Sequence, residues 1–292
     1  MANGTVFTLP VGAWVENRCE REVVVRPIVG RDEAWLCDAG ASRLPAHCAT
    51  HLLARCVSRV GDRSPVTPED IRSLSIGDRE AILLHLRRLT FGDLMQCATI
   101  CPAEDCGEQL EWVLSIDSLL VRGPIASKPR YAMRVSEDDR QYSVEFRLPS
   151  VGDQEAAAVL APRDPEAAGD AILCRCVERV STEDGAALEP EAWPVAVHSQ
   201  LPMRMTELDP QAEIELALVC PACGTEFTTF FDAFAYISQE ISSHADSFYR
   251  EIHLLAYHYH WSEAEILAMT PHKRRRYIDL LLSECGRGPE EP

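Results

Sequence analysis

The chain has 292 residues, of which 46% are hydrophobic and 25% are charged, and this composition excludes wholesale disorder. Its formal net charge of −18, from 28 basic and 46 acidic residues, disfavours general binding to the phosphate backbone of nucleic acids. The chain has neither a basic start followed by an apolar run nor a stretch of about 18 apolar residues. We therefore expect a cytoplasmic protein that spans no membrane.

Residues 5–121 are predicted to form a first module that begins with a β-hairpin and continues into helices. The pattern of apolar residues changes from alternation to helical spacing and back to alternation along this segment. Thr67 and Pro68 are typical of a helix start. The expected elements are strands over 6–9 and 23–28, helices over 52–60, from Thr67 onward and over 82–89, and a cysteine-bearing hairpin near residue 101.

Residues 131–237 are predicted to form a second copy of this module. The sequence Arg-Cys-Val-x-Arg-Val ends both 52–60 and 172–180, with an offset of 120 (176 minus 56) between its cysteines. Two Cys-Pro turns follow with an offset of 119 (220 minus 101). Upstream, Gly30 and Gly152 lie in similar segments with an offset of 122 (152 minus 30). Three blocks in the same order and at nearly the same spacing indicate an internal duplication.

The two Cys-Pro turns are predicted to hold a structural zinc ion through Cys101, Cys106, Cys220 and Cys223. A cysteine pair with two to four intervening residues, followed by Gly, lets one tight turn present two thiolates, and zinc takes four in a tetrahedron. Either the two turns meet within one chain, or each meets its copy in a second chain. Turn cysteines without a metal are the remaining alternative. Four thiolates leave zinc no open position, so this site is expected to be structural.

Residues 240–285 are predicted to form a C-terminal segment of three helices. Ser262 and Glu265 have the spacing of a capping box, and Thr270 with Pro271 is typical of another helix start. The only basic run of the chain follows in this last helix. This run is compatible with a solvated helix face or with a docking patch for an acidic partner. DNA recognition is the third alternative, and the acidic net charge of the chain disfavours it. The candidate partner-binding residues are Tyr257, His258, His260, Trp261, Lys273, Arg274, Arg275 and Arg276.

Catalytic signatures are lacking along the sequence. It contains no Gly-rich phosphate loop, no nucleophile elbow and no His-Glu-x-x-His motif. We therefore expect a protein that is not an enzyme. Together the patterns predict an α+β fold with two tandem modules, each made of a hairpin, helices and a zinc-knuckle hairpin. The modules are joined through a shared zinc ribbon and followed by the C-terminal helices.

Several of these segments together resemble one family. They are Leu9–Gly12, Arg26–Glu33, Leu89–Asp93, the two Cys-Pro turns and the block Ile252–Ile266. Their combination is similar to the T4-type baseplate hub assembly proteins of contractile phage tails and extracellular contractile injection systems. The resemblance implies a non-enzymatic assembly factor or chaperone that binds hub or spike proteins of the baseplate. A permanent baseplate subunit and a zinc-containing nucleic-acid-binding regulator are the alternatives.

Overall fold

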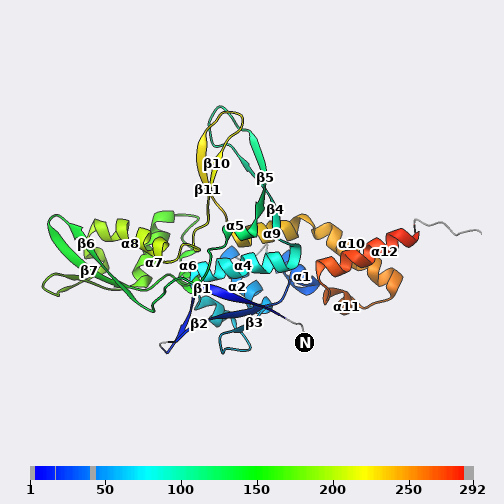
Figure 1. Ribbon diagram of the computed structural model, residues 1–292, viewed down its shortest axis with the longest axis horizontal. Helices are drawn as coiled ribbons and strands as arrows, with labels where there is room; N and C mark the ends of the chain where they lie inside the picture. Colours follow the sequence, from blue (N-terminus) through cyan, green and yellow to red (C-terminus); the bar gives the residue numbers. More distant parts are fainter. Residues whose placement is uncertain (1–3, 17, 40–43, 286–292) are drawn as a thin grey trace, which may run out of the picture.

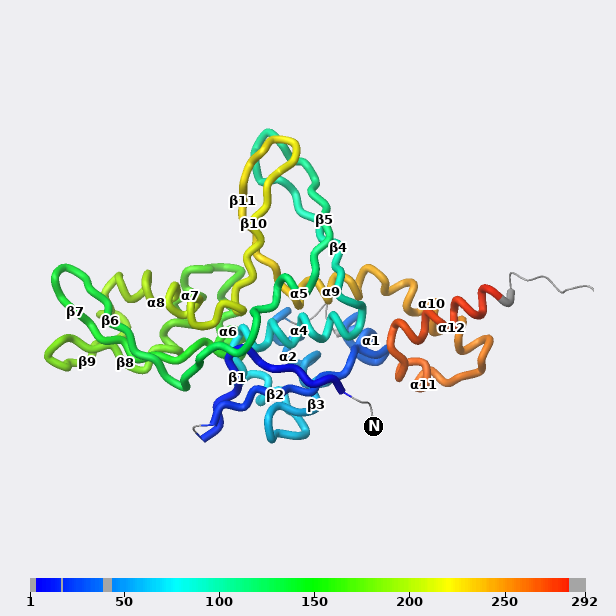
Figure 2. Tube along the Cα trace, viewed as in Figure 1, coloured from blue at the N-terminus to red at the C-terminus, as the bar shows by residue number. Residues whose placement is uncertain are grey.

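The computed structural model describes residues 4–16, 18–39 and 44–285, and it shows a mixed α+β protein with an elongated body (Figure 1). Small antiparallel sheets and twelve α-helices make up these residues. One arm, formed by two β-hairpins, projects from the side of the body (Figure 2). The α+β class expected from the sequence is therefore confirmed.

The first half of the body is built on a three-stranded sheet with the strand order β1-β2-β3. Thr67 begins a helix as predicted, because its side chain and that of Asp70 form a capping box. The elements are β1 (Thr5–Val15), β2 (Arg18–Val25), α1 (Gly30–Ala39), α2 (Pro45–Cys56), β3 (Val57–Val60), α3 (Pro68–Arg72), α4 (Ile76–Phe91), β4 (Leu94–Ile100), β5 (Gln109–Ser115) and α5 (Ile116–Leu119).

The second half has the same order of hairpin, helices and returning strand, on a sheet with the order β6-β7-β8-β9. A short 3-10 helix, Pro190–Ala192, precedes its last long helix. The elements are β6 (Tyr131–Glu137), β7 (Arg140–Phe146), α6 (Val151–Ala157), α7 (Pro165–Cys176), β8 (Val177–Thr182), β9 (Ala187–Leu188), α8 (Val195–Leu208), β10 (Glu215–Val219) and β11 (Glu226–Phe230).

The predicted helix over 52–60, and its counterpart over 172–180, were each wrong in their last residues. Both helices end at a cysteine, and the next residues form strands β3 and β8. Val57 pairs with Val25 across a register shift, and Val177 pairs with Phe146 across another. β-branched side chains favour this extended state once a neighbouring strand is available, although their spacing also suits a helix face.

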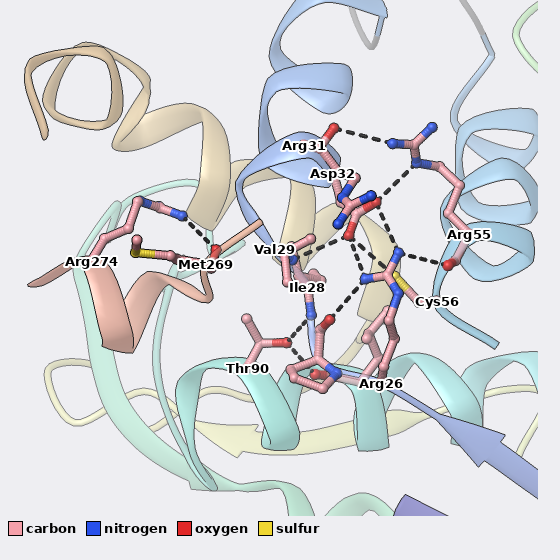
Figure 3. Close-up of polar contacts among 12 residues, drawn as sticks. Arg26, Ile28, Val29, Arg31, Asp32, Arg55, Cys56, Thr90, Met269 and Arg274 are labelled. Carbon is pink, nitrogen blue, oxygen red and sulfur yellow. Dashed lines mark hydrogen bonds and ion pairs between the residues drawn. The ribbon is translucent and has the colours of Figure 1, made fainter. Parts of the chain in front are cut away.

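Each half contains the same buried ion-pair cluster, and Figure 3 shows that of the first half. Asp32, at the start of α1, lies 2.6 Å from Arg26 Nη1 and 2.9 Å from Arg55 Nε. The Asp32 carboxylate also accepts the backbone N–H of Val29 at 3.1 Å. Burial raises the pKa of Asp32, but the hydrogen bond and the charge of Arg26 outweigh burial and hold that pKa below its ordinary value.

In the second half Asp153 takes the same place at the start of α6. It lies 2.6 Å from Arg147 Nη1 and 2.8 Å from Arg175 Nε, and it accepts the Ser150 N–H at 2.9 Å. Burial again raises its pKa, but Arg147 and Ser150 bring it well below the ordinary range. Cys176, like its counterpart in the first half, is buried beside the carboxylate.

The main hydrophobic core does not follow the predicted module boundaries. It is built mostly from 9–116, but it also contains Val151, Ile214 and helix α9 (Ala233–Ser243). The boundary at residue 237 therefore cuts a single helix, in which Ile237 itself is buried. A second, smaller core lies between the β6–β9 sheet and helices α7 and α8.

The C-terminal segment continues with helices α10 (Ala245–Tyr259), α11 (Glu263–Leu267) and α12 (Pro271–Cys285). The Ser262 capping box is present, and Lys273 N–H lies 3.3 Å from the hydroxyl of Thr270. These helices share a small apolar core, and the backbone N–H of Gly30 donates to the carbonyl of Met269 at 3.0 Å. The segment is thus anchored on the start of α1.

Candidate metal centre

The two cysteine turns lie at the tips of the hairpins β4-β5 and β10-β11, which together form the projecting arm (Figure 1). Cys101 continues the ladder of its hairpin, since its N–H donates to the carbonyl of Glu108 at 2.8 Å. Cys220 does the same toward Thr225 at 2.9 Å. Each turn reverses at a glycine that follows the second cysteine, Gly107 with φ +61° or Gly224 with φ +75°. The Cys-Gly pairs of the sequence are explained by this left-handed conformation.

The four predicted ligand sulfurs converge on one point. Cys101 Sγ lies 3.7 Å from Cys223 Sγ, and Cys106 Sγ lies 3.7 Å from Cys220 Sγ. All four sulfurs lie within 4.8 Å of one another. These separations exceed the disulfide bond length of about 2.05 Å. The two separations of 3.7 Å are close to the distance of about 3.8 Å that follows for a tetrahedron with Zn–S bonds of about 2.3 Å.

Both turns come from the same chain, so the site is complete within one copy of the protein. The alternative in which each turn meets its copy in a second chain is not required. A cation held here would join the tip of the β4-β5 hairpin to the tip of the β10-β11 hairpin. Four converging thiols are compatible with a metal site and exclude hard-ligand ions such as Mg²⁺ on the chemistry of the donors.

Apolar side chains surround the inner side of the cluster. Cys101 and Cys220 are buried beside Leu110, and Trp112 and Phe227 pack against them. Cys106 is half-buried and Cys223 is exposed. The cluster therefore lies at the end of a small separate core, with one edge open to water.

The hydrogen bonds and close packing of the four thiols shift the pKa values of two of them in opposite directions. Hydrogen bonds with the side chain and then the backbone of Thr225 lower the pKa of the Cys223 thiol to about 6. The Glu108 backbone lowers the pKa of Cys106, but the neighbouring Cys223 and burial outweigh it and raise that pKa to about 12. Thiols this close cannot all ionise alone, whereas a bound divalent cation deprotonates them.

The candidate partner-binding residues do not form one uniform surface. Tyr257 is 68% exposed, and five others are also exposed: His258, His260, Lys273, Arg275 and Arg276. Trp261 is half-buried, stacked on Tyr259 at a centroid distance of 4.7 Å and packed edge-on against Tyr277.

The inclusion of Arg274 in an exposed basic surface was wrong. Its guanidinium is buried, 2.6 Å from Glu33 and 3.2 Å from Glu251, and it lies over the ring of Phe248 at 4.9 Å. It also donates to the carbonyl of Met269 at 3.2 Å (Figure 3). The i to i+4 packing of α12 turns this one arginine of the basic run toward α10 and α1, and its neighbours toward solvent.

The twin ion-pair clusters were missed as structural sites by reasoning from the sequence. A signal was present, because an arginine precedes an aspartate by six residues at 26 and 32 and again at 147 and 153. The second arginine of each cluster lies in the repeated Arg-Cys-Val segment. The charged residues that recur at matching positions in the two apolar segments could thus have indicated a buried ion pair in each half.

The family described as T4 bacteriophage base plate protein matches residues 5–237, well over half of the chain. The chain belongs to the T4 bacteriophage base plate protein family. The match includes both cysteine turns and both ion-pair clusters, and it ends within α9. The resemblance to T4-type baseplate proteins is thus confirmed at the level of the family.

No curated protein and no solved structure matches the chain significantly. Within the residues that the structure describes, no helix is both long and apolar enough to cross a membrane. The membership of the base plate family therefore rests on the family match alone. It supports a baseplate-associated role, with other baseplate proteins as partners.

Proposed function

We propose that this base plate family member is a non-enzymatic assembly factor that acts as a chaperone for the hub of a contractile phage-tail-like injection system. The observation that carries the proposal is the family match over both halves and the arm. Its partners are hub or spike proteins of the baseplate, and it acts in the cytoplasm before the particle is complete.

The proposed cofactor is one structural zinc ion, held by the four cysteines of the arm. The sulfur separations of 3.7 Å support zinc, as does the donor set of four thiolates. Because the four ligands come from turns far apart in the sequence, the ion would keep the two hairpins together at their tips. Its proposed role is therefore to make the arm rigid.

The proposed origin of the fold is a duplication of one module. Three observations support it: the nearly equal sequence offsets, the shared order of elements and the two ion-pair clusters with nearly equal distances. In this view Cys101 and Cys220 are the same position in two copies, and the zinc ion links the copies across an approximate twofold axis.

The exposed residues of the C-terminal segment are proposed as one partner surface. Lys273, Arg275 and Arg276 supply positive charge on a protein that is otherwise acidic, and Tyr257 supplies an exposed aromatic ring. Such a patch suits an acidic partner, whose encounter it would steer. Reversal of these three charges should reduce co-purification with the partner without unfolding the chain.

A permanent baseplate subunit is the second candidate, because the family description names the base plate itself. One experiment separates the two roles. The gene is deleted and finished sheathed particles are counted, and in parallel the protein is quantified in particles purified from the parent strain. A chaperone is required for assembly and absent from finished particles. A subunit is present at constant stoichiometry, and normal particles after deletion would contradict both roles.

A further inference from the structure

An open groove in the second half corresponds to a groove that is filled in the first half. In the first half, helix α9 packs against α1, α2 and α4. Its apolar stripe, Phe234, Ile237 and Ile241, is buried in the main core, and Glu240 forms an ion pair with Arg87 of α4 at 2.8 Å. Helix α9 thus forms a third layer over the helices that cover the β1–β3 sheet.

Helices α6, α7 and α8 of the second half correspond to α1, α2 and α4, the helices on which α9 packs in the first half. Helices α2 and α7 both begin with proline and end with Arg-Cys at an offset of 120. Helix α8 packs on β6 as α4 packs on β1. In α8, Leu201 and Met205 are buried at the positions of Ile82 and Leu86, with the offset of 119 that also relates the cysteine turns.

In the described part of the chain, no helix packs on α6, α7 and α8 in the way that α9 packs on α1, α2 and α4. A groove of about 700 Å³ lies between α7 and α8 at this place. Residues that are buried in the first half are uncovered at the matching positions of the second. Ala49 is 1% exposed, whereas its counterpart Gly169 is exposed. Leu52 is 0% exposed, whereas its counterpart Ile172 is half-buried. Leu83 is 0% exposed, whereas its counterpart Pro202 is exposed.

The charge around the groove differs from that around α9. Its lining includes the acidic residues Glu166, Asp170 and Glu213. Among the described residues that line it, only His198 could become positive, and His198 already lies 3.0 Å from Asp170. Thr206 of α8 lies at the position that corresponds to Arg87 of α4, and Arg87 forms the ion pair with Glu240 of α9. An occupant of this groove should therefore carry lysine or arginine where α9 carries glutamate.

We propose that the α7–α8 groove binds an amphipathic helix of another baseplate protein, with apolar residues at i, i+3 and i+7 and basic residues beside them. Helix-in-groove binding of this kind is a common mode of recognition, and such helices need only one apolar face. The inference rests on the proposed function only for the source of the helix. The groove itself follows from comparison of the two halves.

The test uses the purified full chain and a labelled synthetic peptide of residues 232–244 with Glu240→Lys, which has the stripe of α9 and the charge that the groove favours. Binding is measured by fluorescence anisotropy. Gly169→Phe should weaken it by at least about tenfold, as expected when a central site is filled. Among the described residues, no atom outside the neighbouring residues and the backbone of α7 lies within 4 Å of a Cβ placed at Gly169, so a larger side chain there begins in open space.

Gln200→Phe is the matched control, because Gln200 is an exposed residue of α8 outside the groove lining. It should leave peptide binding unchanged. Asp170→Lys provides a second variant that reverses a charge of the lining, and it should weaken the lysine peptide more than the unmodified α9 peptide. Circular dichroism checks that each variant keeps its helical content.

Two results would overturn the proposal. The first is equal binding of the lysine peptide to the wild type and to Gly169→Phe, or no binding at all. The second is self-association of the wild-type chain that Gly169→Phe abolishes, since the occupant would then be a second copy. Neither result bears on the particle-assembly experiment, so failure here is distinguishable from failure of the proposed function.

Discussion

Replacement of the buried Arg274 tests how the C-terminal helices are held on the body. Its side chain is 2% exposed, and those of its partners Glu33 and Glu251 are 9% and 18% exposed. Arg274→Met keeps most of the apolar stem but leaves two carboxylates close together without the buried guanidinium that pairs with both. Burial, the largest effect, already raises the pKa of Glu33 above its ordinary value, and Arg274 opposes this rise.

The expected loss is about 3–5 kcal/mol at neutral pH, as for other buried pairs that lose one partner. Glu33 must then either stay charged in a buried place or take up a proton, and both cost free energy. The double variant Arg274→Met with Glu33→Gln should recover much of the loss, because it leaves no unpaired buried charge. A coupling free energy of about 2 kcal/mol between the two sites is expected.

Urea unfolding followed by circular dichroism gives the free energies, and hydrogen exchange shows where the chain opens. Exchange should rise first in α10–α12 and at the amide of Gly30, which is bonded to Met269. Arg276→Met is the control, because Arg276 lies on the exposed side of the same helix and should change stability by less than about 0.5 kcal/mol. A loss for Arg274→Met no larger than for this control would refute the reasoning.

Further predictions concern the metal, the buried carboxylates and a helix cap. The wild-type chain purified without chelator should carry one zinc ion in native mass spectrometry. Cys220→Ser should lose the ion, and the control Cys174→Ser should keep it. A wild-type chain without metal would contradict the assignment. Asp153→Asn should cost about 3 kcal/mol at pH 7. Because the folded pKa of Asp153 is lowered, its contribution to the free energy of unfolding is complete above its unfolded pKa of about 3.9 and is lost as the pH falls below that value. Urea unfolding at pH 3 should therefore show a smaller difference between wild type and Asp153→Asn than at pH 7. Asp78, a buried residue in the first turn of α4, should act in the opposite sense. Burial raises its folded pKa to about 7, so its contribution to stability is complete below about pH 4 and declines as the pH rises toward 7. Asp78→Asn should remove that slope. Ser262→Ala should cost about 1 kcal/mol in α11 by removal of the capping box, seen as faster exchange there, with Ser283→Ala as the unaffected control.

Local features of the fold could be predicted from the sequence because they depend on neighbouring residues. The capping residues Thr67 and Ser262 bond to backbone groups three residues away, whatever the rest of the chain does. The cysteine turns are equally local, since a glycine in the left-handed region closes each one. The repeated Arg-Cys-Val segments also align the two halves with each other, because both halves have the same residues at the end of a helix.

Choices between alternatives of similar local energy needed the tertiary structure. Residues 57–60 and 177–180 suit a helix face or a strand, and the unpaired edges of β2 and β7 decide for the strand. The basic run at 272–276 suits solvent throughout, yet the carboxylates of Glu33 and Glu251 draw Arg274 inward. Both outcomes depend on groups far away in the sequence.

The sequence by itself determined the two cysteine turns, the helix starts and the repeated order of elements, because each of these depends on contacts within a few residues. Only the tertiary structure decided that the turns meet within one chain, that α9 joins the core of the first half and that the corresponding groove of the second half stays open. These last features depend on which apolar surfaces cover one another, and no short segment contains that information.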